Sequence, residues 1–136
     1  MKDVMPKVSV ILTSFNHDKY IREAIDSVLN QTFSDFELII FDDCSTDRSW
    51  EIIKSYSDSR IKAFRNNINQ RGVINLAIKE FVNGEYIAIH HSDDFWEPTK
   101  LEKQVKFLNK NKKIGAVFTH ANIINDDGTL LDKKNH

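Results

Sequence analysis

The feature that most constrains the fold is the alternation of short apolar segments with longer segments of helical periodicity. Residues 8–12 are apolar or β-branched at nearly every position, as in a parallel strand that is buried on both faces. Residues 20–29 then repeat apolar side chains at the spacing of an amphipathic helix. Strands separated by helices form right-handed βαβ units. The sequence therefore predicts an α/β fold with a mainly parallel sheet and helices on both faces.

The same alternation continues along the rest of the chain. The expected further strands lie at residues 36–41, 60–64, 85–90 and 114–119, with helices between them at about 50–56, 73–81 and 98–108. The run Asn125-Asp126-Asp127-Gly128 is a turn signal and predicts a small hairpin. A chain of 136 residues suits one domain with a single core.

Composition excludes several classes of protein. A net charge of −1 gives no global attraction to nucleic acid, and no apolar run is long enough to span a bilayer. Residues 1–6 lack the apolar stretch of a secretion signal. Cys44 is the only cysteine of this sequence, so an internal disulfide is excluded and a reducing compartment is favoured. We expect a cytoplasmic protein that does not bind nucleic acid.

Polar side chains follow four of the predicted strands. These polar segments are residues 13–16, 42–45, 65–67 and 90–94. One polar loop needs no functional explanation, because loops are generally polar. In open α/β sheets, however, ligands bind beyond the carboxyl ends of the strands, where the topology switches. Polar groups at four strand ends therefore predict one shared cleft.

The acidic pair Asp93-Asp94 is the sharpest chemical signal. Two adjacent carboxylates repel each other, and a hard divalent cation that also binds substrate phosphates would offset this repulsion. Such a cation would neutralise the charge that develops on a departing diphosphate. The alternative is an acidic cap for the helix that begins near Pro98. That alternative explains one carboxylate more easily than two.

A second acidic pair, Asp42-Asp43, follows the second predicted strand. An aspartate at a strand end can accept hydrogen bonds from a base or a ribose. The alternative is capping of the next helix, a role that Ser45, Thr46 or Asp47 can fill instead. We assign ligand contact to Asp43 and a supporting role to Asp42.

Several segments together resemble glycosyltransferase family 2, over roughly residues 7–120. The matching segments are Val8–Asn16, Leu29–Phe33, Glu37–Ile40, Asp42–Asp47, Gly84–Ala88, Ser92–Pro98 and Lys100–Glu102. The resemblance implies the Rossmann-like, nucleotide-binding half of a type A glycosyltransferase fold. It also implies a nucleotide-diphosphate sugar donor of the UDP or dTDP type, Mn²⁺ or Mg²⁺ as cofactor, and transfer with inversion.

The resemblance also assigns nucleotide contacts by motif position. Thr13 and Asp43 would contact the base, and Ser92 would lie near the ribose. Ser14 and Asp42 complete the expected nucleotide-binding set on these strand ends.

The metal motif departs from the family pattern. Asp93 would bind the metal together with Asp94, but His91 stands where the family usually has its first acid. A neutral imidazole can still bind a metal, although it lowers the negative charge of the site. Relatives often place an arginine before the third helix, near the base. Arg71 is the nearest candidate here, but its spacing from the neighbouring segments differs from the family's.

Inverting transfer needs a general base that deprotonates the acceptor hydroxyl. Family members carry this base, with the acceptor pocket, well past the metal motif. Asp126 and Asp127 are explained by a turn, so we expect the base beyond His136. Residues 1–136 would then be a single nucleotide-sugar-binding domain that stops before the acceptor-binding half. An exposed apolar patch should mark the surface where that half packs.

Two further hypotheses concern a zinc site and a contact with anionic lipid. His90, His91 and His120 suggest a zinc site with Asp93, but adjacent strand residues point to opposite faces. A basic stripe could touch anionic lipid, although a solvated helix face is the simpler interpretation. The lysines of this stripe are Lys100, Lys103, Lys106, Lys110, Lys112 and Lys113.

The predicted function is sugar transfer to a saccharide or lipid-linked acceptor in cell-surface polysaccharide synthesis, in the cytoplasm or at the inner face of the membrane. Alternatives are a nucleotide-binding module without turnover and a sugar nucleotidyltransferase. The latter needs a glycine-rich, basic loop after the first strand, which residues 13–17 lack. A response-regulator receiver would carry its acids after the first and third strands, whereas here they follow the second and fourth.

Overall fold

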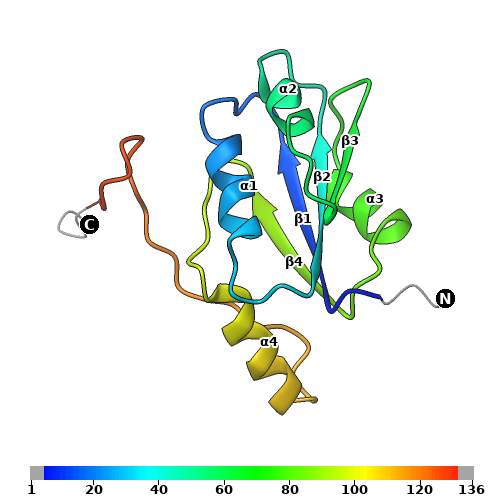
Figure 1. Cartoon of the computed structure of the whole chain (residues 1–136), viewed down its shortest axis with the longest axis vertical. Coiled ribbons are helices and arrows are strands. Elements are labelled where there is room, and N and C mark those ends of the chain that lie inside the picture. Colours follow the sequence, from blue (N-terminus) through cyan, green and yellow to red (C-terminus); the bar gives the residue numbers. More distant parts are fainter. Residues whose placement is uncertain (1–4, 132–136) are drawn as a thin grey trace.

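The computed structural model describes residues 5–131 and confirms the predicted α/β fold (Figure 1). Strands and helices alternate along the described chain, and each strand is followed by a helix. The elements are β1 (Val8–Ser14), α1 (Ile21–Leu29), β2 (Phe36–Asp42), α2 (Ser49–Lys54), β3 (Ile61–Arg65), α3 (Val73–Glu80), β4 (Tyr86–His91) and α4 (Lys100–Lys110).

The described strands form one parallel sheet in the order β3-β2-β1-β4. The chain moves outward from β1 through β2 to β3 and then returns to the other side of β1 as β4 (Figure 1). At the tip of β1, Thr13 lies between Phe41 of β2 and His91 of β4. The switch point of the topology therefore lies between β1 and β4, where open α/β sheets bind ligands.

Helices cover both faces of the sheet, as the sequence predicts. On one face α1, α2 and α4 pack against alternate residues of β1 and β2, including Leu12 and Ile40. On the other face α3 packs against Ile11, Ile39 and Phe41. All seven residues of β2 are buried, which explains why the stretch 38–41 is apolar at every position without alternation.

The C-terminal part of the described chain differs from one prediction and confirms another. The strand expected at 114–119 is not formed: these residues pair with no strand in the described chain, and Phe118 is 90% exposed. An apolar segment becomes a strand only when a neighbour satisfies its backbone groups. The hairpin does form, with an antiparallel bridge between Ile124 and Leu130 around a turn in which Gly128 has φ +82°.

Two further features concern the apolar character of the helices and the exposed face of β4. No described helix combines the length and the apolar character that crossing a lipid bilayer would require. On β4, Ile87 and Ile89 are about two-fifths exposed, on the face where α3 covers β1 and β2. An apolar surface against which a further half of the protein packs stays a prediction.

Candidate functional site

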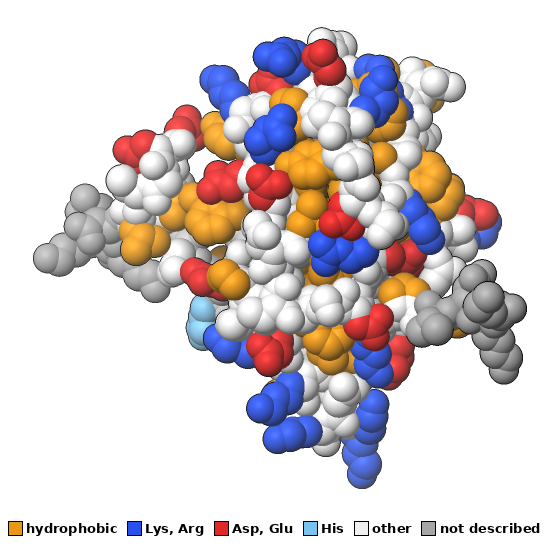
Figure 2. Space-filling model, viewed as in Figure 1, with side chains coloured by type: hydrophobic (Ala, Val, Ile, Leu, Met, Phe, Trp, Pro, Cys, Tyr) orange, Lys and Arg blue, Asp and Glu red, His pale blue; other side chains and the backbone are white. Residues whose placement is uncertain are grey.

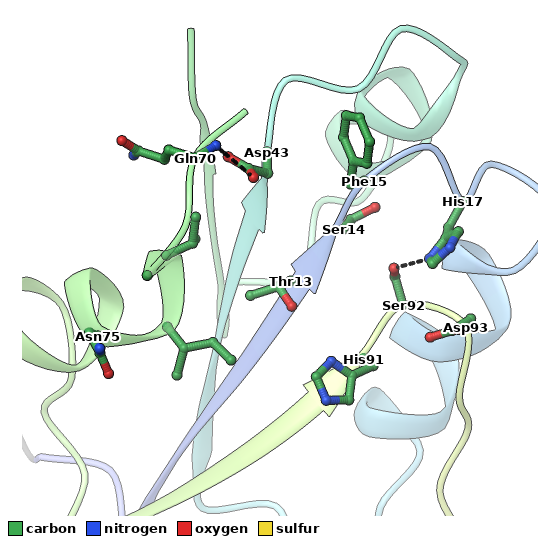
Figure 3. A pocket seen from close by; sticks show the side chains of 13 residues that line it. Thr13, Ser14, Phe15, His17, Asp43, Gln70, Asn75, His91, Ser92 and Asp93 are labelled. Atoms are coloured by element: carbon green, nitrogen blue, oxygen red, sulfur yellow. Dashed lines mark hydrogen bonds between the residues drawn. The ribbon is translucent and has the colours of Figure 1, made fainter. Parts of the chain in front are cut away.

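The carboxyl ends of the strands surround a cavity of about 550 Å³ (Figure 3). This volume is within the range of small-molecule sites, roughly 300–1,000 Å³. Its lining comes from the tips of β1, β2 and β4 and from the segment that enters α3. The lining residues are Thr13, Ser14, Phe15, His17, Asp43, Gln70, Gly72, Val73, Ile74, Asn75, His91, Ser92 and Asp93.

Five residues that the sequence nominated line this cavity: Thr13, Ser14, Asp43, Ser92 and Asp93. Asp43 follows β2 and Asp93 follows β4, so the two carboxylates approach from opposite sides of β1. The parallel sheet places them at the same edge, because all four strand tips point the same way. The predicted convergence of acidic residues at one cleft is therefore observed, and their ligands stay a prediction.

The remaining nominated residues lie outside the lining. Asp42 is fully buried, and its Oδ2 accepts a hydrogen bond from the Ser45 backbone N–H at 3.0 Å and lies 3.3 Å from Arg65 Nε. Asp42 thus supports the loop after β2. Arg71 is exposed between two lining residues, and Asp94 is exposed beside Asp93.

The loop after β1 is fastened to the loop after β2. The backbone N–H of Asn16 donates to Ser45 Oγ at 2.9 Å, and Asn16 Oδ1 accepts from the Thr46 N–H at 2.8 Å. The Asp18 N–H donates to Asp47 Oδ2 at 2.9 Å. Most polar side chains of the segment Asp42–Asp47 are therefore used within the protein. Of these side chains, that of Asp43 is the one that lines the cavity.

Asp43 also connects the strand tips. Its backbone N–H donates to the Ser14 carbonyl at 2.8 Å, and its carboxylate accepts from Asn66 Nδ2 at 2.7 Å. The Gln70 N–H donates to the same carboxylate, at 3.1 Å from Oδ2 (Figure 3). An ionised carboxylate offers about four acceptor positions. Asp43 can therefore hold the segment before α3 and still accept a hydrogen bond from a ligand.

The charge of the lining is negative. Asp43 and Asp93 contribute carboxylates, and no lysine or arginine lines the cavity in the described part of the chain. Within residues 5–131, no group of three or more His, Cys, Asp or Glu side chains is placed to hold a metal. Mg²⁺ is usually held by one or two carboxylates and substrate phosphates. Asp93 fits a cation that is completed by oxygens of a bound diphosphate.

The two adjacent histidines of β4 behave differently. His91 lines the cavity, whereas His90 is 1% exposed on the opposite face, with Nε2 3.3 Å from the Ala24 carbonyl oxygen. This confirms that they point to opposite faces and cannot share a zinc ion. Burial lowers the pKa of His90 to about 4, so this ring is a neutral core residue.

Eight of the thirteen lining residues were not predicted as ligand contacts, and three of these, Phe15, His91 and His17, carry aromatic or imidazole rings. Phe15 is 44% exposed at the cavity, and its place among the polar residues 13–16 was an available signal. His91 was considered as a replaced acid and as a possible metal ligand, but not as a nucleotide contact. His17 gave no local signal, because its relevance depends on Ser92, which lies 75 positions away in the sequence.

A parallel sheet with a cavity at its switch point is the arrangement in which open α/β proteins bind ligands, nucleotides among them. Residues 9–135 match the family described as Glycosyl transferase family 2. The chain therefore belongs to glycosyltransferase family 2.

Sequence identity to individual relatives supports this assignment. The chain is 38% identical over 120 residues to the UDP-Glc:α-D-GlcNAc-diphosphoundecaprenol β-1,3-glucosyltransferase WfaP of Escherichia coli, covering 87% of this chain and 46% of WfaP. It is 39% identical over 140 residues to TuaG of Bacillus subtilis (strain 168), a glycosyltransferase named for teichuronic acid biosynthesis, covering 100% of this chain and 55% of TuaG. The chain thus spans about half the length of these relatives.

A solved structure shares the fold. The structure of Staphylococcus aureus TarS residues 1–349 in complex with UDP-GlcNAc superimposes with a TM-score of 0.72 at 31% identity. The match covers 78% of this chain and 32% of the TarS chain. The α/β architecture described above is therefore that of the type A glycosyltransferases.

Proposed function

We propose that this chain forms the donor-binding part of an inverting glycosyltransferase that uses a nucleotide-diphosphate sugar. The observation that carries the proposal is the convergence of Asp43 and Asp93, from two different strand tips, on one polar cavity. Thr13 contributes a hydroxyl group between them, whereas the Oγ of the neighbouring Ser14 is buried without a hydrogen-bond partner in the described chain. The acceptor, the general base and the turnover of the whole protein are part of the proposal, because the chain spans about half of its relatives.

The nucleotide base is assigned to the Asp43 side of the cavity. The carboxylate of Asp43 can accept a hydrogen bond from a base N–H, as a strand-end carboxylate does at a fixed position. The ring of Phe15 offers an aromatic face on which a base can stack. Asp42 supports this side from the core, and Arg71 would have to turn inward to contribute.

The diphosphate is assigned to the Asp93 side. Without lysine or arginine in the described lining, the negative charge of a diphosphate needs a cation from solution. Asp93, with Asp94 next to it, would hold Mn²⁺ or Mg²⁺. The bound metal would supply charge neutralisation of the leaving diphosphate. Ser92 and His91, which line the cavity beside Asp93, would then face the ribose and phosphate oxygens.

Relatives support the choice of donor and acceptor. TarS was solved with UDP-GlcNAc, and WfaP is named for transfer from UDP-glucose to a diphosphoundecaprenol-linked sugar. By this similarity, the proposed donor is a UDP-sugar and the proposed acceptor is a lipid-linked saccharide of cell-surface polysaccharide synthesis.

A nucleotide-binding module without turnover is the second candidate. Asp43 and Asp93 are the carboxylates of the lining, and both have assigned roles, so the described residues offer no free carboxylate base at the cavity. A sugar nucleotidyltransferase receives no support, since residues 13–17 at the end of β1 contain neither glycine nor a basic pair.

Calorimetric titration with UDP, with and without Mn²⁺, tests the proposal. We expect binding that requires Mn²⁺ and is abolished by EDTA, and Asp93→Asn should reduce wild-type affinity to the level seen with EDTA. Glu23→Gln is a matched control, because Glu23 is exposed on α1 away from the cavity. Binding that is unaffected by either EDTA or Asp93→Asn would refute the metal-dependent site.

The surface of α4 supports a contact with anionic membrane. Lys103, Lys106, Phe107 and Lys110 occupy positions i, i+3, i+4 and i+7, so they share one helix face. Phe107 is 42% exposed, and none of these lysines pairs with a carboxylate within residues 5–131. Figure 2 shows basic side chains gathered at this end of the molecule. We propose that this face associates peripherally with the inner membrane surface.

Sedimentation with phosphatidylglycerol vesicles, against phosphatidylcholine vesicles, tests this contact. Each lysine near an anionic surface contributes about 1 kcal/mol, so replacing Lys103, Lys106 and Lys110 by glutamate should weaken binding at least 100-fold, an order-of-magnitude estimate. The matched control replaces the exposed lysines Lys19, Lys54 and Lys79. Equal binding of both triple variants would refute a specific role for α4.

A further inference from the structure

We propose that His17 and Ser92 act as a pair that donates a hydrogen bond to a phosphate oxygen of the bound nucleotide. This inference rests on the proposed nucleotide binding and goes beyond it, because neither the family motifs nor the charge pattern assigns a role to His17. The proposal is derived from the geometry of the pair, from its chemistry and from the charge of the cavity.

The pair joins two strand tips at the switch point. His17 Nδ1 lies 2.7 Å from Ser92 Oγ, so the loop after β1 is bonded to the tip of β4. Figure 3 shows the imidazole and the hydroxyl facing each other beside Asp93. Both residues line the cavity, although Ser92 as a whole is only 2% exposed.

His17 is held in place by its own backbone. Its N–H donates to Ser49 Oγ at 3.0 Å, and Ser49 is fully buried at the start of α2. The neighbouring Asn16 and Asp18 are bonded to the loop after β2, as described above. The imidazole therefore approaches the cavity from a fixed position, which reduces the conformational entropy that a ligand contact would cost.

The hydrogen-bonding capacity of the pair leaves one donor for a ligand. A neutral imidazole has one N–H and one acceptor nitrogen, and a serine has one O–H. If the Ser92 hydroxyl donates to Nδ1, the imidazole proton is on Nε2 and is available to a ligand. If Nδ1–H donates to Ser92 Oγ, the hydroxyl proton is available instead. Either tautomer leaves one polar hydrogen unused by the other partner.

The charge of the lining identifies the ligand atom that this donor suits. Asp93 directly follows Ser92, and no lysine or arginine of the described chain lines the cavity. A nucleotide diphosphate held against Asp93 by a cation would have phosphate oxygens that the cation does not contact. These oxygens are charged acceptors, and donors to charged groups form the stronger hydrogen bonds. The His17–Ser92 pair supplies such a donor without adding negative charge.

Titration of UDP and of uridine in the presence of Mn²⁺ tests the inference. We expect His17→Ala to weaken UDP binding roughly 10- to 100-fold, the range for loss of a hydrogen bond to a charged group. Uridine, which lacks phosphate, should bind all variants equally. His17→Asn should recover part of the UDP affinity, because its amide can accept from Ser92 and donate to a ligand. His120→Ala is the matched control, since His120 is exposed and outside the lining.

A double variant distinguishes a pair from two separate contacts. If His17 and Ser92 act together, His17→Ala combined with Ser92→Ala should cost little more than either change alone. Additive losses would refute the pair, and an equal loss for UDP and uridine would show that His17 supports the nucleoside side instead. Wild-type UDP affinity in His17→Ala would refute the inference and leave the proposed function intact. Failure of the wild-type protein to bind UDP would refute the proposed function itself.

Discussion

The side-chain Oε1 of Gln31 accepts a hydrogen bond from the backbone N–H of Leu101 at 3.0 Å. The Nε2 of the same side chain donates to the Glu97 carbonyl at 2.8 Å and to the Ser27 carbonyl at 3.1 Å. Gln31 is 6% exposed and lies in the turn between α1 and β2. One buried amide therefore fixes both sides of the turn into α4, shortly after Asp93. This contact joins in space two of the segments that resemble glycosyltransferase family 2, Leu29–Phe33 and Ser92–Pro98.

Replacement of Gln31 by alanine should destabilise the protein by about 1–3 kcal/mol. The change leaves the Leu101 N–H without a partner, and a buried unsatisfied polar group costs roughly 1–3 kcal/mol, whereas the Glu97 carbonyl keeps the Lys100 N–H at 3.0 Å. Urea unfolding measures the change in free energy. Gln104→Ala in α4 is the control, because Gln104 forms no side-chain hydrogen bond with the described chain, and it should change stability by less than about 0.5 kcal/mol. A similar loss for both variants would contradict the assigned role.

Gly84 lies two residues before β4, where the chain passes close to Val8 and Ser9 of β1. A Cβ at this position would be 2.5 Å from the Ser9 backbone nitrogen and 2.7 Å from the Val8 carbonyl carbon. The adjacent Asn83 N–H is held by Glu37 Oε1 at 2.8 Å, so the turn cannot move away without breaking this contact. The glycine of the segment Gly84–Ala88 is thus explained by space rather than by ligand binding.

Gly84→Ala should therefore cost about 2–3 kcal/mol or more, because the added methyl group meets backbone atoms. Thermal unfolding followed by circular dichroism provides the measurement. Gly115→Ala is a close control, since no atom lies within 4 Å of the added Cβ, and it should leave the melting temperature nearly unchanged. An unchanged melting temperature for Gly84→Ala would show that the turn yields more easily than its hydrogen bonds suggest.

Phe15 should contribute to nucleotide affinity through stacking on the base. Its ring is 44% exposed at the cavity, and stacking of one base on an aromatic side chain contributes about 1–3 kcal/mol. Phe15→Ala should weaken UDP binding roughly 5- to 100-fold in calorimetry, whereas Phe15→Tyr should retain it. Phe118→Ala, at a position that is 90% exposed and outside the lining, is the control. If Phe15→Ala bound UDP as tightly as the wild type, the base would have to lie elsewhere.

The fold could be predicted because its information is local. The apolar runs at 8–12 and 36–41 identify buried strands, and parallel βαβ connection then determines that their tips meet. The strand expected at 114–119 was wrong, because apolar composition does not show whether a strand edge accepts the segment. The local propensity of a segment does not show whether another strand lies beside it to pair with it.

The candidate site was predictable in part for the same reason. Asp43 and Asp93 stand directly after predicted strands, so the sheet alone brings them to one edge. The sequence predicts a supporting role for Asp42 and ligand contact for Asp43, and the burial of Asp42 in the core agrees with that division. The contact between His17 and Ser92 depends on the spacing of β1 and β4 and on two loop conformations. This contact cannot be derived from a periodic pattern.

His90 should make the stability of the protein depend on pH between about 4 and 6.5. Burial is the main cause that lowers its pKa to about 4; His91 and Lys100 act in the same direction, whereas the Ala24 carbonyl and Asp93 oppose the shift. An unfolded histidine titrates near 6.5, so between these two values the unfolded chain binds more protons than the folded chain. The free energy of unfolding should therefore rise with pH across this window and level off above it.

The expected loss on acidification from pH 7 to pH 4 is about 2–3 kcal/mol from His90 alone, as an order of magnitude. Urea unfolding at several pH values without added metal measures it. His90→Leu preserves an apolar contact with Trp96, whose ring centroid lies 4.5 Å from that of His90, and should flatten the dependence. His120→Leu, at an exposed position, should keep the wild-type slope. If His90→Leu retained that slope, another group would have to bind the proton on unfolding, and His90 would be charged or solvated in the folded protein.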